Sequence, residues 1–271
     1  MFEQIYKNAR AIPREGDYTD DQGMCLCGKC GKPRECFIEH PAGSRKGIIK
    51  AVPCQCEIEE EERYQQRRSL EKFRDRVVEL RQHGITDKAY TYQRFENDDG
   101  RNYVVTKKCK QYVSKWQTMK KHCYGITFTG AVGGGKSFFA CCIANALIDQ
   151  GVRVLVTRLS DLVRNRVQDK YAVVDFHDFD LIVLDDIGVE GATQTAYNII
   201  DDIYRANIPL IVTTNMSLDQ LKESTTIEKQ RIYDRILQRA SYPIKVDVTI
   251  SRLEIARKNA KDIQDILNEG L

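Results

Sequence analysis

The sequence predicts an α/β fold, a five-stranded parallel sheet flanked by helices, preceded by a small cysteine-rich module and a helical linker. Three observations predict it. Short apolar runs alternate with helical stretches in residues 84–271, a pattern typical of a parallel sheet covered on both faces. Six of the ten cysteines lie between Cys25 and Cys56. Residues 57–82 contain neither glycine nor proline and carry apolar residues at helical spacing.

The composition limits the size and the partners of the protein. With 271 residues, 42% of them hydrophobic and 30% charged, the chain can bury one sizeable core and a small second one. Lys plus Arg number 42 and Asp plus Glu 39. This near balance disfavours nucleic-acid binding by net charge alone, although a local basic groove remains open.

The start of the chain and its apolar runs bear on location. Glu3, Lys7 and Arg10 fall where a secretory signal needs an apolar core. The longest apolar runs are far below the ~20 residues that cross a bilayer. We therefore expect no membrane span and a cytoplasmic, reducing location. Cysteines there are more often metal ligands, small buried hydrophobic residues or reactive thiols than disulfides.

Residues 25–56 have too little apolar material to fold on hydrophobic burial alone. Cys27-Gly-Lys-Cys30 is a C-x-x-C pair, and Cys54-Gln-Cys56 supplies a second pair. Four thiolates can close a tetrahedral zinc site, whose metal would contribute the missing folding free energy. A thioredoxin-type redox pair would require a βαβ pattern that residues 1–60 do not have. The expected zinc ligands are Cys27, Cys30, Cys54 and Cys56, with Cys25 and Cys36 as spare cysteines, either of which could replace one of them.

The remaining elements follow from apolar periodicity. A long charged helix is expected over residues 57–82, ended by His83-Gly84, and the boundary between the two domains, 1–83 and 84–271, is placed there. Strands are expected at 126–129, 152–157, 181–184, 210–214 and 244–249. Helices are expected at 103–122, 137–150, 160–168, 193–206 and 228–240.

A glycine-rich segment between the first of these strands and its helix matches G-x-x-x-x-G-K-[ST] at every specified position. Glycines let successive backbone N–H groups face a phosphate, and the helix adds its positive N-terminal end. Lys136 would reach the β- and γ-phosphates and Ser137 would bind Mg²⁺. A glycine-rich turn with a solvated lysine is the alternative. The residues expected to bind the nucleotide are Gly130, Gly133, Gly134, Gly135, Lys136, Ser137 and Phe138.

Two further strands end in polar residues. Asp185 follows the apolar run 181–184, at the strand end where ligands bind in open parallel sheets, and is expected to hold Mg²⁺ through water. Asp186 is a candidate to polarise the attacking water. Asn215 follows the strand at 210–214 and either orients that water or caps the next helix. Because no Asn-Lys-x-Asp guanine signature occurs, the nucleotide is expected to be ATP.

With these motifs the sequence resembles the DnaC/DnaI/IstB-like branch of the AAA+ ATPases, replicative helicase loaders in particular. The matching segments are 130–137, 145–151, 184–188, 209–215 and 229–236, together with the two cysteine pairs. The resemblance implies an AAA+ ATPase domain over 84–271 and an N-terminal region, 1–83, that grips the replicative helicase. It also implies self-association through the AAA+ interface.

The resemblance assigns roles to single residues. Asn215 corresponds to sensor 1, Arg252 to the sensor 2 arginine that contacts the nucleotide, and Arg231 or Arg235 to an arginine finger, with Asp234-Arg235 the better match. A finger given to a neighbouring subunit makes hydrolysis depend on assembly. Solvated surface positions are the alternative for each arginine. Asp186 stands where many AAA+ proteins have Glu, and its shorter reach suggests slow turnover suited to a switch.

The expected function is ATP-dependent loading of a hexameric replicative DNA helicase onto single-stranded DNA in replication initiation. An IstB-like transposition helper ATPase is the alternative within the branch, and a zinc-bearing nucleotide adapter without hydrolysis is the alternative outside it. Single-stranded DNA needs a basic track with stacking groups. Two sets of basic residues could form one or could be solvated: Lys107, Lys108, Lys110, Lys115, Lys120 and Lys121, and Arg158, Arg164 and Arg166.

Overall fold

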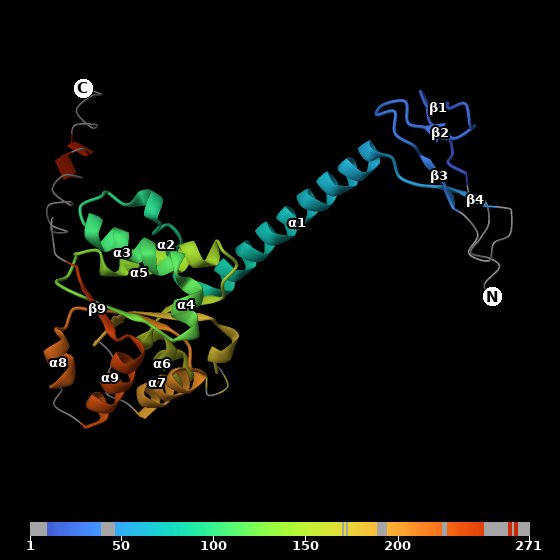
Figure 1. Ribbon diagram of the computed structural model, residues 1–271. Coiled ribbons are helices and arrows are strands. Elements are labelled where there is room, and N and C mark those ends of the chain that lie inside the picture. The colour runs from blue at the N-terminus through green and yellow to red at the C-terminus, as the bar shows by residue number, and fades with distance from the viewer. Residues whose placement is uncertain are drawn as a thin grey trace. The chain divides into compact units, whose positions relative to one another are not determined.

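The computed structural model describes residues 10–38, 47–169, 171, 173–188, 194–223, 227–246, 260–261 and 263–264. The chain divides into two compact units, Met1–Arg74 and Asp75–Leu271. This division falls inside the long helix α1, Gln55–Gly84, ahead of the boundary expected at residue 83 (Figure 1). None of the described helices has the length and apolar character needed to cross a membrane.

The first unit contains two small antiparallel sheets that the sequence analysis did not anticipate. β1, Tyr18–Thr19, pairs with β2, Cys25–Leu26, and β3, Glu35–Ile38, pairs with β4, Ile48–Ala51. The buried side chains described in this unit are mainly cysteines and charged groups: Cys25, Cys27, Cys54, Arg34 and Glu35. Among its described residues the unit therefore has no ordinary apolar core, in keeping with its composition.

The second unit contains the expected parallel sheet, with five strands among the described residues in the order β6-β7-β8-β5-β9. All neighbouring pairs are parallel. The strands are β5, Ile126–Thr129; β6, Val154–Arg158; β7, Leu181–Ile187; β8, Leu210–Thr214; and β9, Tyr242–Lys245. The predicted fold class is confirmed.

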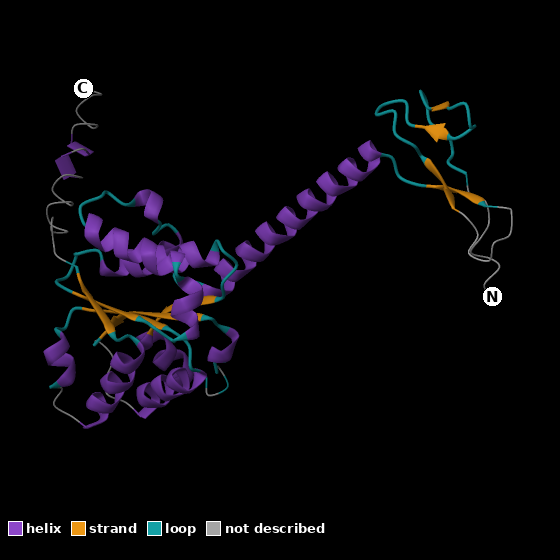
Figure 2. Cartoon of the chain, in the orientation of Figure 1, coloured by secondary structure: helices purple, strands orange, loops and turns teal. Residues whose placement is uncertain are grey.

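Helices cover both faces of this sheet (Figure 2). Alternate side chains of β7 divide between two apolar clusters, because successive residues of a strand point to opposite faces. The helices are α2, Lys88–Thr91; α3, Tyr103–Ser114; α4, Trp116–Lys121; α5, Lys136–Ile148; α6, Leu159–Gln168; α7, Gln194–Ala206; α8, Leu218–Lys222; and α9, Ile227–Arg239, with 3-10 turns η2, Phe95–Asn97, and η3, Phe176–Asp178. Leu181 and Val183 join the cluster that contains α3 and α5, whereas Ile182 and Leu184 join the cluster that contains α6, α7 and α9.

Several elements differ in their bounds from the expectation or were not expected, and two of the differences have a local cause. The helix expected at 103–122 is divided at Lys115, whose φ of −102° and ψ of 20° end α3 and begin α4. The last strand begins at Tyr242, ahead of the expected 244, because Pro243 is accommodated in a strand that pairs only with β5 among the described strands. Residues 247–249 of the expected strand lie outside the described residues.

Candidate nucleotide site and cysteine cluster

The loop between β5 and α5 has a backbone conformation that requires glycine at its first position. Gly130 has a φ of 137°, and a Cβ there would lie 2.2 Å from the carbonyl oxygen of Val246. Gly133 and Gly135 also have positive φ, 85° and 94°, and Gly135 is the N-cap of α5. The loop therefore leads into a helix N-terminus, where free N–H groups and the helix dipole favour a phosphate.

Lys136 is the first residue of α5 and is almost fully buried. Its Nζ donates hydrogen bonds to the carbonyl oxygen of Ala131 at 2.9 Å and to Oδ1 of Asn215 at 2.7 Å. The ammonium group is thus held beside the loop by oxygen acceptors, which are the kind of partner that a phosphate would supply. This is the position expected of a lysine that reaches a nucleotide.

Asp185 lies near the end of β7 and is 4% exposed. Its Oδ1 accepts a hydrogen bond from Thr213 Oγ1 and its Oδ2 accepts one from the Tyr90 hydroxyl, each at 2.7 Å. Both carboxylate oxygens are therefore oriented by neighbouring side chains. Hydrogen bonds that orient a metal-binding group are a regular feature of metal sites, so this donor set fits the predicted Mg²⁺ ligand.

Tyr90 is a site residue that the sequence analysis missed. Burial and the adjacent Asp185 carboxylate raise the pKa of its phenol, so the phenol keeps its proton and donates a hydrogen bond to that carboxylate. The Tyr90 hydroxyl in turn accepts a hydrogen bond from Arg158 Nε at 3.1 Å. Asn145 fixes the main chain of α2 by donating to the carbonyl oxygen of Tyr90 at 2.8 Å. No local pattern could reveal a contact with a carboxylate so far along the chain.

Asp186 and Asn215 form the exposed part of the site. Asp186 has a φ of 56° at an irregularity in the pairing of β7 with β8, and its N–H donates to Thr213 Oγ1 at 2.8 Å. Asn215 Nδ2 donates to Asp186 Oδ1 at 3.2 Å. Thus one amide contacts both Asp186 and Lys136, as expected of a residue that orients the hydrolytic site.

The alternative interpretation of Asn215 as a helix cap is wrong. The N-cap of α8 is Ser217, whose side chain accepts from the N–H of Gln220 at 3.1 Å. The Gln220 side chain accepts from the N–H of Ser217 in return, at 2.8 Å, which completes a capping box. The Asn215 side chain is therefore left to the site.

These residues line a pocket of about 610 Å³, a size suited to a nucleotide. The predicted residues in its lining are Gly133, Gly135, Lys136, Ser137, Phe138, Asp185, Asp186 and Asn215. Gly134 lines a second pocket of about 250 Å³, which shares Gly133, Gly135 and Phe138 with the first. The lining of the first, larger pocket also contains Tyr90, Arg158 and Thr213, which the sequence analysis did not assign to the nucleotide.

Of the three predicted arginines, the two that the structure describes, Arg231 and Arg235, do not line this pocket. Arg235 contacts α7, where its guanidinium lies 2.9 Å from Asp201 Oδ1 and 4.6 Å from the centre of the Tyr197 ring. Arg231, on the same helix, is exposed. Arg252 lies outside the described residues. Neither described arginine reaches the nucleotide pocket of its own chain, so a role in a neighbouring subunit stays a prediction.

Several of the basic residues considered for nucleic acid have acidic or aromatic partners within the chain. Arg164 pairs with Asp161 at 2.7 Å and Lys120 with Asp180 at 2.8 Å. The ammonium group of Lys108 lies 5.6 Å from the centre of the Tyr242 ring, which lines a pocket of about 370 Å³. Three further members have such partners: Asp202 for Arg166, Asp87 for Arg158 and Phe95 for Lys110.

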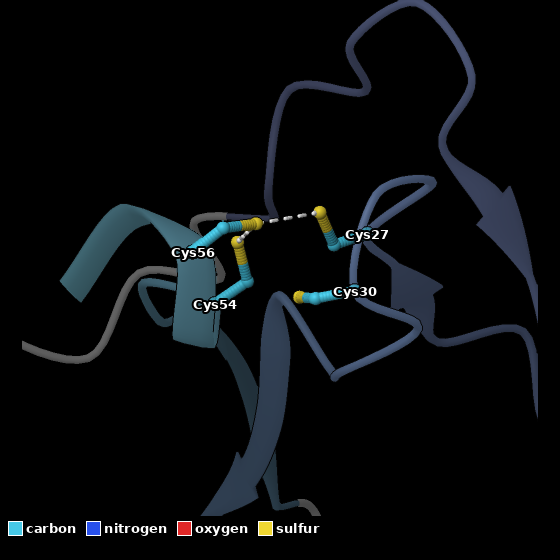
Figure 3. Close-up of side chains that lie close together, drawn as sticks. All are labelled: Cys27, Cys30, Cys54 and Cys56. Atoms are coloured by element: carbon cyan, nitrogen blue, oxygen red, sulfur yellow. Dashed lines mark hydrogen bonds between the residues drawn. The ribbon is translucent and has the colours of Figure 1, made fainter. Parts of the chain in front are cut away.

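In the first unit the four predicted cysteines come together (Figure 3). Their Sγ atoms all lie within 4.8 Å of one another, with Cys27 to Cys56 at 3.4 Å and Cys54 to Cys56 at 3.3 Å. Sulfur ligands of a tetrahedral zinc with ~2.3 Å bonds lie about 3.8 Å apart, so the arrangement fits this metal. Among the described residues, neither of the spare cysteines joins the group.

The surroundings of the four thiols differ. Backbone N–H groups of Cys30 and Lys29 lower the pKa of Cys27, and those of Lys32 and Cys56 lower the pKa of Cys30 to about 6. Hydrogen bonds with the other three thiols raise the pKa of Cys56 to about 12. The C-x-x-C turn therefore favours thiolates, the form that binds metal, and it does so through backbone donors.

Comparisons with known proteins agree with this geometry. The family model described as IstB-like ATP binding protein matches residues 54–258. A putative insertion sequence ATP-binding protein of Sinorhizobium fredii is 37% identical over 87 residues, which cover 30% of this chain and 29% of that protein. The replicative helicase loader DnaC of Escherichia coli K12 is 27% identical over 138 residues, which cover 48% of this chain and 55% of that protein.

The chain thus spans only part of the length of these relatives. Among solved structures, that of DnaI has a TM-score of 0.49 and 22% identity, and it covers 60% of this chain and 97% of that one. The crystal structure of the DnaC helicase loader has a TM-score of 0.47 and 18% identity, with 60% of this chain and 100% of that one covered.

Proposed function

Because the chain belongs to the family of IstB-like ATP binding proteins, we propose that it is a slow cytoplasmic ATPase that loads a hexameric replicative helicase onto single-stranded DNA. The family membership confirms the resemblance drawn from the sequence. The observation that carries the proposal is the joining of Lys136, Asn215 and Asp186 by hydrogen bonds at one edge of the sheet. A phosphate-binding lysine and a carboxylate able to polarise water are thereby held together, as ATP hydrolysis requires.

Each residue of this proposed site has a separate task. Lys136 binds the β- and γ-phosphates, and the amide of Asn215 keeps the Asp186 carboxylate oriented toward the attacking water. Ser137 and Asp185 would hold Mg²⁺, which when bound supplies positive charge against the phosphates. The Asp185 carboxylate is already oriented by Thr213, so little reorganisation is needed.

Slow turnover follows from the short side chain of Asp186. The main chain at this residue is fixed by the hydrogen bond to Thr213, so reach depends on the side chain alone. A carboxylate one methylene shorter than Glu approaches the water less closely, and near-contact distances decide proton-transfer rates. ATP binding and hydrolysis would then act as an assembly switch.

The arginine finger is assigned to α9 as part of the same proposal. Arg235 would have to break its ion pair with Asp201 to act in a neighbouring subunit, whereas Arg231 is exposed and needs no such change. Mixing Lys136→Ala protein with a finger variant tests the assignment. A mixed assembly regains activity when an intact loop meets an intact finger. Activity that stays absent for Arg235→Ala and returns for Arg231→Ala would identify Arg231 as the finger.

The first unit is proposed to hold one zinc ion and, with α1, to grip the helicase. Cys27, Cys30, Cys54 and Cys56 would be the ligands. The metal would contribute structural free energy to a unit whose described buried residues are mainly cysteines and charged groups. Elemental analysis of purified protein should return about one zinc per chain.

A second candidate function, a transposition helper ATPase, is favoured by the similarity to the insertion sequence ATP-binding protein. Co-purification separates the two. The loader proposal predicts an ATP-dependent complex with a hexameric helicase that Lys136→Ala abolishes. A complex formed with a transposase but not with any replicative helicase would overturn it.

Phosphate release, measured with and without single-stranded DNA, separates both functions from a nucleotide adapter. Asp186→Asn should keep ATP binding and lose turnover, because it preserves shape and removes the acceptor. ATP binding without any phosphate release in the wild type, with DNA and helicase present, would leave only the adapter.

A further inference from the structure

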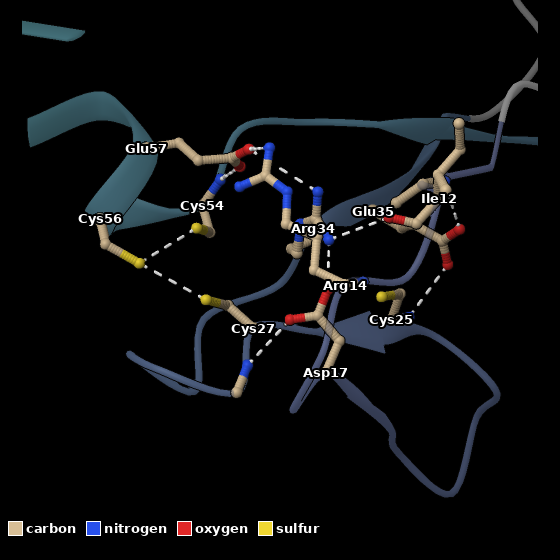
Figure 4. Close-up of polar contacts among 12 residues, drawn as sticks. Ile12, Arg14, Asp17, Cys25, Cys27, Arg34, Glu35, Cys54, Cys56 and Glu57 are labelled. Atoms are coloured by element: carbon tan, nitrogen blue, oxygen red, sulfur yellow. Dashed lines mark hydrogen bonds and ion pairs between the residues drawn. The ribbon is translucent and has the colours of Figure 1, made fainter. Parts of the chain in front are cut away.

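The two cysteine pairs of the first unit come from separate segments, and a carboxylate holds the main chain of each (Figure 4). Asp17 Oδ1 accepts a hydrogen bond at 3.0 Å from the N–H of Gly28, inside the C-x-x-C turn. Glu57 Oε2 accepts one at 2.9 Å from the N–H of Cys54, where α1 begins. Each carboxylate therefore fixes the backbone next to a sulfur ligand.

The C-x-x-C turn packs directly on the segment that carries Asp17. A Cβ on Gly28 would lie 2.0 Å from the carbonyl oxygen of Gly16. Only glycine allows the two backbones to approach so closely. A displacement of Asp17 would therefore move the turn that presents Cys27 and Cys30.

A single guanidinium lies between these two carboxylates. Arg34 pairs with Asp17 through Nη1, and its Nη2 lies 3.7 Å from Glu57 Oε1. The Arg34 and Asp17 side chains are only 8% and 4% exposed. A buried charge is costly unless it is paired, so removal of one partner has a large effect.

The main chain of Arg34 links the same segments. Its N–H donates to the carbonyl oxygen of Cys25 at 2.8 Å, and its carbonyl oxygen accepts from the N–H of Val52 at 2.8 Å. Val52 lies just before the second cysteine pair. Arg34 therefore contacts the segments next to both cysteine pairs through backbone and side chain, although it contributes no sulfur.

We propose that Arg34 is a positioning residue for the cysteine cluster, which through Asp17 and Glu57 holds the two cysteine pairs at the spacing that a tetrahedral metal needs. This inference rests on the proposed zinc site and does not depend on the ATPase. Partners that orient ligands in this way are worth about 10–100-fold in metal affinity. Arg34 raises the zinc affinity by restricting the ligands before the metal binds.

The chain supplies a matched control. Arg14 also pairs with Glu57, but its side chain is 62% exposed and it does not contact Asp17 in a side-chain ion pair. Exposed ion pairs are worth little. Replacing Arg14 by Met removes the same charge from the same carboxylate and leaves the link between the two halves intact.

The experiment uses the full chain loaded with zinc alone and measures zinc release to a chromogenic chelator. Arg34→Met should release zinc about 10–100-fold faster than the wild type. Arg34→Lys keeps the charge but cannot contact Asp17 and Glu57 through two separate nitrogens, so its rate of zinc release should lie between those of Arg34→Met and the wild type. Arg14→Met should release zinc at the wild-type rate. If Arg34→Met does not fold, Asp17→Asn replaces it, because Asn keeps an acceptor for Gly28 and loses the charge opposite Arg34.

A second measurement separates positioning from general stability. In the cobalt-loaded chain, the visible bands of tetrahedral Co²⁺ should shift in Arg34→Met, return toward the wild type in Arg34→Lys, and be unchanged in Arg14→Met. Wild-type zinc release and wild-type cobalt bands in Arg34→Met would overturn the proposal. A wild type that binds no zinc would overturn it together with the zinc site. Nucleotide affinity, measured in the same samples, reports on the ATPase separately.

Discussion

The contact between Asn215 and Asp186 allows a sharp test of the hydrolytic site. In Asn215→Ala the Asp186 carboxylate loses the donor at 3.2 Å that orients it, while the backbone hydrogen bond from Asp186 to Thr213 remains. The acceptor is charged, so the hydrogen bond belongs to the class worth about 1.5–3 kcal/mol. Because both side chains are exposed, about 1–2 kcal/mol is the appropriate range.

That range corresponds to a fall of about 5–30-fold in turnover, since each 1.36 kcal/mol is tenfold in rate. Nucleotide affinity should change less, because Lys136 keeps its hydrogen bond to the carbonyl oxygen of Ala131 at 2.9 Å. Steady-state phosphate release gives the turnover, and titration with a fluorescent ATP analogue gives the affinity. The expected pattern is a loss in kcat with nearly constant nucleotide Kd.

Ser217→Ala is the matched control. It removes the cap of α8 two positions from Asn215, at a cost of about 1 kcal/mol in stability, without touching Asp186. Turnover in Ser217→Ala should equal that of the wild type under conditions where both proteins are folded. Wild-type turnover in Asn215→Ala, or an equal loss in both variants, would refute the argument that the amide orients the carboxylate.

Three further outcomes are expected. Tyr90→Phe removes one of the two hydrogen bonds to buried Asp185 and should lower the free energy of unfolding without nucleotide by about 1.5–3 kcal/mol in denaturant titrations; no change would mean that the hydroxyl is not needed. Burial alone would raise the pKa of Asp180, but hydrogen bonds, chiefly from Arg153, hold it at about 2. Asp180→Asn should therefore lower the free energy of unfolding by about 1–2 kcal/mol at pH 7. This difference between variant and wild type should vanish as pH falls from about 4 to 2, since the carboxyl of the unfolded wild type then protonates first. Gly130→Ala places a methyl group 2.2 Å from a carbonyl oxygen and should abolish ATP binding with an unchanged circular dichroism spectrum; normal affinity would contradict the loop geometry.

The sheet could be predicted because its signals are local. The interior strands β7 and β8 begin with short apolar runs, and the loop at Gly130 combines a motif with the strand and helix that it requires. The four-cysteine group could also be predicted, because sequence spacing limits which thiols can meet. The break at Lys115 could not, since its flanking residues keep one apolar face on both sides.

The missed parts of the site depend on contacts between distant segments. Tyr90 meets Asp185 only because α2 packs on α5, and a tyrosine in a short helix carries no sign of this. The side-chain pairing of Arg235 with Asp201 is likewise a matter of how α9 packs on α7. Sequence alone could have favoured Ser217 over Asn215 as the N-cap of α8, because Ser217-x-x-Gln220 is the pattern of a capping box.

The proposed phosphate-binding and hydrolytic residues lie together at the carboxyl ends of neighbouring strands. Strands β5, β7 and β8 are neighbours, and Lys136, Asp185 and Asn215 follow or end them. Thr213 and Asn215, at the end of β8, contact Asp185 and Asp186 of β7 and Lys136, the first residue of the helix that follows β5. The end of one strand therefore contacts the lysine and both carboxylates. If the proposed function holds, a change in what Lys136 binds would reach the Asp186 carboxylate through the single amide of Asn215, and the turnover of Asn215→Ala tests that link.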